Sequence, residues 1–244
     1  MSEERIIVVD HLTKRFGGLK AVDDVSIHLN RGETLGLIGA NGAGKTTLFN
    51  MISGVLKPTS GTITFDGVEI QKKKAHEICK MGIGRTYQIV QPFTTLTLLE
   101  NVLAGALMRH PRVADAREVA EGIIDMLGIS HLKNTKGASL TLIQLKRMEI
   151  ARALATEPKV LLLDEVMAGL NPGERVELLE TMQKIKETGI SIIIIEHIMK
   201  VIMTLADRAY VLNQGCLIAE DTPQKVMEHP DVIKSYIGER HYAS

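Results

Sequence analysis

Residues 39–47 carry the strongest chemical signal in the sequence. They read GANGAGKTT, which fits the pattern G-x-x-x-x-G-K-[ST], and they lie between an apolar segment at 35–38 and a helical stretch closed by Gly54. Small residues let the backbone approach a phosphate closely, while Lys45 adds a point charge and the Thr46 hydroxyl can bind Mg²⁺. The residues expected to contact a nucleoside triphosphate are Gly39, Asn41, Gly42, Ala43, Gly44, Lys45, Thr46 and Thr47. The alternative is a glycine-rich turn that only reverses the chain.

Two carboxylates follow a predicted buried strand at 160–163. Open α/β sheets bind ligands at the carboxyl ends of their strands, so Asp164 is placed to hold Mg²⁺ and its water shell. Glu165 is placed to orient and polarise an attacking water. Taken alone, an Asp-Glu pair after a strand is more often the start of a turn. Together with the phosphate loop, the pair predicts phosphoryl transfer.

The next predicted strand is followed by Glu196 and His197. A single histidine in such a place is usually a satisfied surface residue. Beside a γ-phosphate at the end of a sheet, it could instead donate a hydrogen bond to the transferred charge. The residues alone leave both interpretations of His197 open.

The elements that must position these residues change in type along the chain. Short strands are predicted at 6–9, 22–29, Thr34–Ile38 and 62–65, with turns at 30–32 and 66–67. Apolar residues at intervals of three and four predict a helix over 113–127 in an inserted helical segment. Apolar strands at 160–163 and 190–195 flank an amphipathic helix at 174–187, which predicts a parallel sheet buried on both faces. Asn171, Pro172 and Glu174 predict a capped start for that helix.

Composition limits the class of protein. Lys and Arg number 29, as do Asp and Glu, so no overall positive charge attracts nucleic acid or an anionic bilayer. The two cysteines, Cys79 and Cys216, lie far apart and fit a reducing compartment. The first residues lack the features of a secretory signal, and no apolar run approaches the roughly 20 residues that span a bilayer. We expect a cytoplasmic protein whose contact with a membrane is peripheral, through a partner.

With these elements in this order, the chain resembles the ATP-binding subunits of ABC transporters over essentially its whole length, and most closely the branched-chain amino acid transporter group. The segment LTKRFGGLKAV at 12–22 is similar to the adenine-stacking segment of that family, which implies that Phe16 stacks on the base. Without the resemblance, Phe16 would be expected in the core. The segment AGLN at 168–171 is similar to the D-loop, and His197 corresponds to the switch histidine, which favours its functional interpretation.

The segment GIGRTYQ at 82–88 resembles the Q-loop of the family. The resemblance implies that Gln88 reaches Mg²⁺ and the attacking water, and that it joins the catalytic core to the helical subdomain. The following residues, LTLLENV at 96–102, fit the usual continuation, in the region that receives the transmembrane partner. Without the resemblance, Gln88 would be expected as an ordinary polar residue at a strand end.

The signature loop departs from the family. The motif LSGGQ is replaced by LTLIQ at 140–144, in which Ile143 stands where a glycine is expected. The resemblance assigns Thr141 and Gln144 to the nucleotide held by the opposite subunit, but a β-branched residue limits close approach to a phosphate. Either the loop still donates backbone N–H groups, which Thr141 and the helix start favour, or one composite site of an asymmetric pair is weak. Val166, in place of the common proline, is a smaller departure.

The resemblance implies a P-loop NTPase (RecA-like) α/β core with an N-terminal antiparallel β subdomain and an inserted α-helical subdomain. Residues 1–91 and 153–222 would form the core with its β subdomain, 92–152 the helical subdomain and 223–244 a short helical tail. The implied ligands are ATP and Mg²⁺, with Lys45, Gln88, Glu165 and His197 in catalysis and Thr46, Gln88 and Asp164 at the metal.

The resemblance also implies an ATPase on the inner face of the cell membrane that drives separate transmembrane permease subunits, with branched-chain or other amino acids as cargo. Its partners would be those subunits, a second ATP-binding subunit and, for an importer, indirectly a substrate-binding protein, with no nucleic acid and no direct contact with cargo. The alternatives are a lipopolysaccharide-export subunit, a catalytically impaired partner in a heterodimer, and a soluble ABC protein acting on ribosomes or DNA. Homodimer or heterodimer and import or export stay open.

Overall fold

The computed structural model describes residues 4–240 of the chain. Within this range the chain forms two compact units. Unit 1 comprises the described residues up to Ile78 together with those from Ser191 onward, and unit 2 comprises Cys79–Ile190. The last four residues of the predicted C-terminal tail, 241–244, lie outside the described residues.

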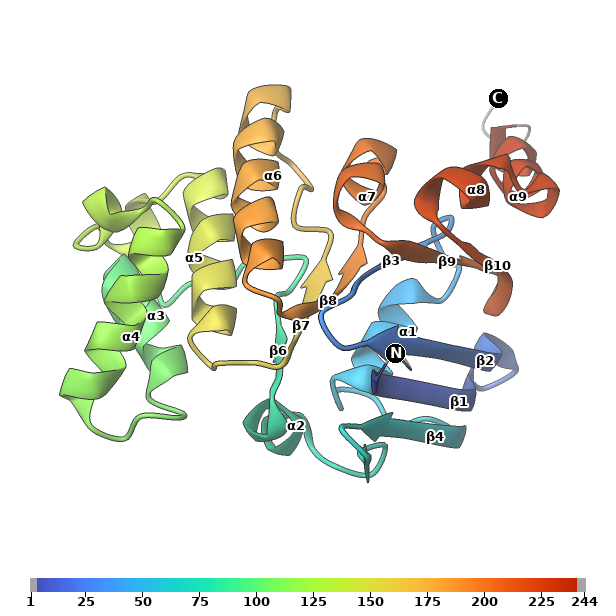
Figure 1. Ribbon diagram of the computed structural model, residues 1–244, viewed down its shortest axis with the longest axis horizontal. Helices are drawn as coiled ribbons and strands as arrows, with labels where there is room; N and C mark the ends of the chain where they lie inside the picture. The colour runs from blue at the N-terminus through green and yellow to red at the C-terminus, as the bar shows by residue number, and fades with distance from the viewer. Residues whose placement is uncertain (1–3, 241–244) are drawn as a thin grey trace. The chain divides into compact units, whose positions relative to one another are not determined.

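The first sheet of unit 1 is antiparallel, with strand order β2-β1-β4-β5. Figure 1 shows β1 between β2 and β4. Its strands are β1 (Arg5–Phe16), β2 (Leu19–Asn30), β4 (Ser60–Phe65) and β5 (Val68–Glu69). In the pairing of β1, Val8 lies opposite His28 of β2 and Thr64 of β4. The three predicted N-terminal strands at 6–9, 22–29 and 62–65 are confirmed. The first two are longer than predicted because β-bulges carry the pairing of β1 and β2 past polar residues that interrupt the apolar pattern.

The other strands of unit 1 are β3 (Thr34–Ile38), β8 (Ser191–Ile195), β9 (Arg208–Asn213) and β10 (Cys216–Asp221). β3 pairs in parallel with both β8 and β9, and β10 pairs antiparallel with β9. Every side chain of β3 and β8 is buried, so both faces of these strands are covered, as the continuous apolar runs predict. The helices of unit 1 are α1 (Lys45–Ile52), α7 (Met199–Leu205), α8 (Pro223–Glu228) and α9 (Pro230–Arg240).

Unit 2 contains a parallel strand pair and four α-helices. The strands are β6 (Ile83–Arg85) and β7 (Val160–Asp164), and the helices are α3 (Leu98–Ala106), α4 (Val113–Met126), α5 (Leu142–Leu154) and α6 (Pro172–Glu187). A further helix, α2 (Ala75–Met81), crosses the boundary between the units in sequence. Short 3₁₀ turns lie at Ser130–Leu132 and Gly137–Ser139. The predicted helix over 113–127 is confirmed as α4.

Helices α3, α4 and α5 pack against one another (Figure 1). Ala116, Ala120 and Ile124 form the buried stripe of α4, at the spacing of four that one helix face requires. At α3, a Cβ on Gly105 would lie 2.4 Å from the carbonyl oxygen of Arg152, so only glycine allows α3 to approach α5 this closely. The small residues of α3 and α4 therefore set the position of α5.

Helix starts follow the capping chemistry that the sequence predicts. The Asn171 side chain accepts a hydrogen bond from the N–H of Glu174 at 3.0 Å, and Glu174 accepts one from the N–H of Asn171 at 2.9 Å. This reciprocal pair is the predicted capping box at the start of α6, with Pro172 in the first turn. No helix among residues 4–240 combines the length and apolar character needed to cross a bilayer.

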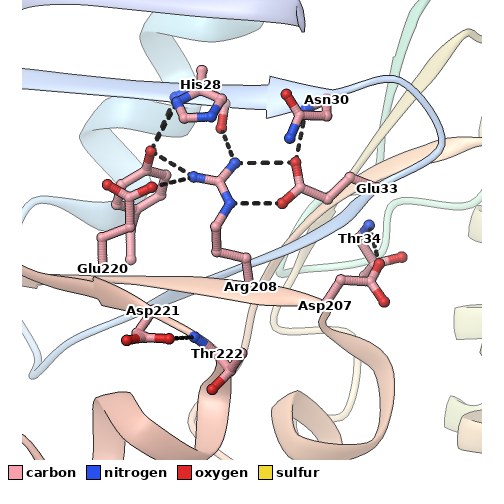
Figure 2. A network of polar contacts seen from close by, with 10 residues as sticks. His28, Asn30, Glu33, Thr34, Asp207, Arg208, Glu220, Asp221 and Thr222 are labelled. Carbon is pink, nitrogen blue, oxygen red and sulfur yellow. Dashed lines mark hydrogen bonds and ion pairs between the residues drawn. The ribbon is translucent and has the colours of Figure 1, made fainter. Parts of the chain in front are cut away.

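A partly buried arginine joins the two sheets of unit 1 (Figure 2). The Arg208 guanidinium, from β9, donates to both carboxylate oxygens of Glu33 at 2.8 and 3.0 Å. It also donates to the backbone oxygen of His28 on β2 at 2.8 Å, to the Tyr210 hydroxyl at 2.7 Å and to Glu220 on β10 at 2.5 Å. The planar fork of arginine suits this bidentate arrangement, which ties β2 to the edge formed by β9 and β10.

The same network makes the stability of unit 1 depend on pH. Burial, followed by the cationic Arg208 and Arg5, holds the pKa of His28 below its usual value of 6.5. The unfolded chain therefore binds more protons than the folded chain as pH falls through 6.5, so this contribution to stability is present at neutral pH and is lost on acidification. We expect Tm to fall more for the wild type than for His28→Asn between about pH 7.5 and 5.5. Equal falls, measured by thermal melts of both proteins, would contradict this assignment.

Candidate functional site

The phosphate loop of unit 1 depends on two glycines. Gly39 has φ 152° and Gly44 has φ 103°, in the region that favours glycine. A Cβ on Gly39 would lie 2.2 Å from the oxygen of Leu212, and one on Gly44 would lie 2.3 Å from the oxygen of Ala21. The loop is therefore pressed against β9 and β2, and its conformation is fixed by the surrounding backbone. The predicted alternative of a simple reversing turn does not require such close packing.

The end of this loop has the chemistry of an anion site. α1 begins at Lys45, and its N-cap is Gly44, which has no side chain that could cap the first turn. Amides at a helix N-terminus, with the helix dipole behind them, bind phosphate. The Lys45 side chain is buried and its Nζ donates to the oxygens of Gly39 and Ala40 at 2.6 and 2.8 Å. Thr46 is exposed, as a hydroxyl that binds Mg²⁺ must be. These residues fit a triphosphate and its metal.

His197 lies at the same edge of the sheet as the phosphate loop. β3 and β8 are parallel neighbours, with Leu37 opposite Ile195. Gly39 and His197 each follow two residues after this pair, so the chain leaves both strands at equivalent positions. His197 is exposed, whereas the preceding Glu196 is buried. The placement fits a histidine that donates to phosphate, the interpretation that the residues alone left open.

Phe16 does not lie in the core. It ends β1 opposite Leu19 in a tight hairpin, and 47% of its surface is exposed. The Lys14 ammonium lies 5.1 Å from the centre of its ring. The expectation from composition alone, a core aromatic, is therefore wrong, because the strand has left the core by this residue. An exposed ring is available for stacking on a planar ligand.

Unit 2 holds the two carboxylates at the end of β7. Asp164 is buried, and its Oδ2 accepts from the Arg85 guanidinium of β6 at 3.2 Å. The backbone N–H of Asp164 donates to the Thr86 hydroxyl at 3.3 Å. A carboxylate held in this way fits a ligand for Mg²⁺. Sequence reasoning gave Arg85 no role, because the local pattern does not show that its strand pairs with β7.

Gln88 and Glu165 are brought together although 77 residues separate them in sequence. The Gln88 amide Nε2 donates to Glu165 Oε2 at 2.6 Å. Glu165 itself has φ 47°, a left-handed conformation that costs free energy in a residue with a side chain and is typical of functional sites. Gln88 lies in a loop beyond β6 and not at a strand end. The amide therefore fixes one carboxylate oxygen of a strained residue.

The signature loop keeps a regular helix start despite Ile143. Thr141 is the N-cap of α5, and its N–H donates to Gln144 Oε1 at 2.9 Å. Ile143 is partly buried, and the neighbouring Leu142 packs against Gly169 of the D-loop, where an added Cβ would lie 2.9 Å from Leu142 Cδ2. Sequence reasoning missed this contact, for which the small Gly169 was the only signal. Gln144 was predicted to contact a nucleotide, and here its side-chain oxygen accepts the hydrogen bond that caps the helix.

Comparisons with known proteins identify the family. Residues 22–168 match the model of the ABC transporter family, and residues 216–242 match that of the branched-chain amino acid ATP-binding cassette transporter. The chain is 38% identical over 250 residues to the high-affinity branched-chain amino acid transport ATP-binding proteins BraF of Pseudomonas aeruginosa and LivG of Escherichia coli K12. Each alignment covers 96% of this chain and 98% of the relative.

Solved structures that resemble this chain support the same family assignment. The ADP conformation of an ATP-binding cassette of an ABC transporter gives a TM-score of 0.86 at 35% identity, covering 96% of this chain and 99% of that one. A dimeric, post-hydrolysis cassette bound to ADP and Pi gives a TM-score of 0.80 at 25% identity, covering 89% and 98%. The predicted P-loop ABC ATPase fold is confirmed. The chain belongs to the ABC transporter family, as an ATP-hydrolysing, ATP-binding subunit.

Proposed function

We propose that this subunit uses MgATP to drive uptake of branched-chain or other amino acids through separate transmembrane permease subunits, from the inner face of the cell membrane. The match of residues 216–242 to a branched-chain amino acid cassette model supports the cargo class, since it lies outside the part of the chain matched by the general family model. The names of relatives that align over 96% of the chain support the same class.

In the proposed mechanism, the amides at the N-terminus of α1 and the Lys45 ammonium bind the phosphates of ATP, while Phe16 stacks on its base. Thr46, Gln88 and Asp164 would hold Mg²⁺, which neutralises phosphate charge when bound. Glu165 polarises the attacking water. Because the Gln88 amide donates to Glu165 Oε2, it would orient the carboxylate that accepts a proton from the water. His197 would donate to the transferred phosphoryl group.

The proposed partners follow from this mechanism. A second ATP-binding subunit would close on the first with two ATP molecules between them, and a substrate-binding protein would act indirectly. We assign the core to 1–91 and 153–222, the tail to 223–244 and the helical subdomain to 92–152. The described loop at 87–96 exposes apolar side chains, among them Tyr87, Ile89 and Phe93, as a surface that receives a transmembrane subunit requires. The cargo would not touch this chain.

Transport in proteoliposomes tests the proposal. The chain would be purified with the membrane subunits that copurify from its host, reconstituted with ATP and Mg²⁺ on its own side, and supplied with labelled leucine, isoleucine or valine. ATP-dependent accumulation of these amino acids, absent with ADP, is the expected result. Two results together would assign the chain to the alternative class of export subunits: ATP hydrolysis that no amino acid stimulates, and outward movement of lipopolysaccharide.

Ile143 favours a second candidate, a subunit whose signature loop no longer supports hydrolysis. The regular start of α5 argues for the active interpretation, because its backbone amides keep their helical direction. We therefore expect Ile143→Gly to change the kcat of ATP hydrolysis by less than about threefold, equivalent to under ~1 kcal/mol in the barrier. Ile143→Ala is the matched control, since it removes bulk without adding backbone freedom. A rise above about tenfold in Ile143→Gly would establish the impaired-partner interpretation.

A further inference from the structure

Three charged side chains of α5 bind the backbone of the segment that carries Gln88. Lys146, Glu149 and Arg152 follow one another at intervals of three, so they share one face of the helix. Lys146 Nζ donates to the backbone oxygen of Gln88 at 3.0 Å, and Glu149 Oε1 accepts from the N–H of Tyr87 at 3.1 Å. Arg152 donates to the backbone oxygen of Gln91 at 3.1 Å. We call these three residues the α5 clamp.

Two members of the clamp are charged groups in the interior. Lys146 and Glu149 are each 2% exposed, among apolar neighbours such as Met148 and Ile150. Burying a charge costs free energy even when it is paired, so a helix that only had to pack would place apolar side chains there. Burial raises the pKa of Glu149 although the Tyr87 N–H and the cations Arg152 and Lys146 oppose that rise. These charges therefore indicate a task beyond packing.

The segment that they hold has little structure of its own. Residues 86–93 form neither helix nor strand, and Tyr87 and Ile89 are 51% and 75% exposed. A loop with few buried apolar contacts opens at low cost in free energy. Its two ends are held by Thr86, whose N–H donates to the oxygen of Leu162 at 2.9 Å, and by the Asn101 side chain, which bonds the backbone of Phe93 at 2.8 and 3.1 Å. Between these ends, its contacts include the clamp, the Gln88 bond to Glu165 and the Arg85 guanidinium 4.9 Å from the Tyr87 ring centre.

We infer that Lys146, Glu149 and Arg152 are positioning residues for ATP hydrolysis, which hold the backbone at 87–91 so that the Gln88 amide stays on Glu165. The inference rests on the proposed roles of Gln88 and Glu165. α5 begins at the signature loop, so a displacement of this helix would move the backbone of Gln88 with it. Nucleotide affinity should depend little on the clamp, because its members act through Gln88 and not through the phosphate loop.

Paired variants of the full chain test the clamp. The variants Lys146→Met and Glu149→Met remove the contacts. The conservative variant Lys146→Arg keeps a donor, and Glu149→Gln keeps an acceptor. Arg147→Met is the matched control, because it removes a cation from the same helix that bonds instead to the backbone oxygen of Glu177. ATP hydrolysis against MgATP concentration gives kcat and KM, and hydrogen exchange with mass spectrometry gives deuterium uptake over 86–92.

The two methionine variants should lower kcat by roughly 10- to 100-fold with KM changed less than about threefold, since small displacements of a catalytic group cost this much. Deuterium uptake in these variants should rise over 86–92 and stay at the wild-type level in the rest of the chain. The conservative variants and Arg147→Met should keep kcat within about threefold of wild type. If a buried-site variant does not fold, Arg152→Met, whose side chain is partly exposed, gives the same readouts with a smaller expected loss.

Either of two results would overturn the inference. One is unchanged deuterium uptake over 86–92 in the methionine variants, which would show that the clamp does not hold the segment. The other is raised uptake with wild-type kcat, which would show that the order of the segment is irrelevant to hydrolysis. A different outcome is a wild-type chain that hydrolyses no ATP while deuterium uptake over 86–92 rises in the methionine variants. In that case the proposed function of the isolated subunit fails, and the structural role of the clamp stands.

Discussion

Glu165→Gln should lower the kcat of MgATP hydrolysis by about 10²- to 10⁴-fold, the range that a positioned general base contributes. The amide is isosteric and can still accept the hydrogen bond from Gln88, but it cannot take a proton from water. ATP binding should persist, because the phosphate loop is unchanged. The variant should therefore accumulate as an ATP-bound dimer, recorded by light scattering as a doubling of the 26.8 kDa mass.

Glu187→Gln is the control for this variant, since it removes an exposed carboxylate from the end of α6 in the same unit. Its hydrolysis and its mass with ATP should match those of the wild type. A Glu165→Gln protein that retains more than about a tenth of wild-type kcat would remove Glu165 from the role of base and leave Asp164 or solvent to accept the proton.

Arg208→Met should lower the free energy of unfolding by about 2–4 kcal/mol, towards the range expected when one partner of a buried ion pair is removed, because the Arg208 and Glu33 side chains are only 17% and 10% exposed. Methionine fills much of the volume but leaves the Glu33 carboxylate, whose side chain is only 10% exposed, without its bidentate partner. It also removes the donor that reaches the backbone oxygen of His28. Urea unfolding followed by circular dichroism measures the change.

The double variant Arg208→Met with Glu33→Gln separates the lost pair from the stranded charge. It should recover at least about 1 kcal/mol relative to Arg208→Met alone, because a neutral amide costs less to bury than an unpaired carboxylate. The amide oxygen can still accept from the N–H of Asn30, which bonds to Glu33 at 2.7 Å. A loss below about 1 kcal/mol in the single variant would mean that the network in Figure 2 is largely replaceable by water.

The sequence by itself determined the local features of this protein. The strand Thr34–Ile38, the phosphate loop, the turn at Gly54 and the capping box at Asn171 depend on residues close together in the chain, and each lies where the pattern predicts it. Apolar periodicity of 2 or 3.6 and cap chemistry are properties of a few neighbouring residues, so they can be predicted without knowledge of the rest of the fold.

Only the tertiary structure decided which distant side chains meet. Arg85 reaches Asp164 and Gln88 reaches Glu165 because β6 pairs in parallel with β7, and nothing in the local pattern names a strand's neighbour or its register. Lys146 and Glu149 look like an ordinary solvated helix face until the packing of α5 buries them. Burial and partnership are set by elements that fold back from far along the chain, and these decide which charges are functional.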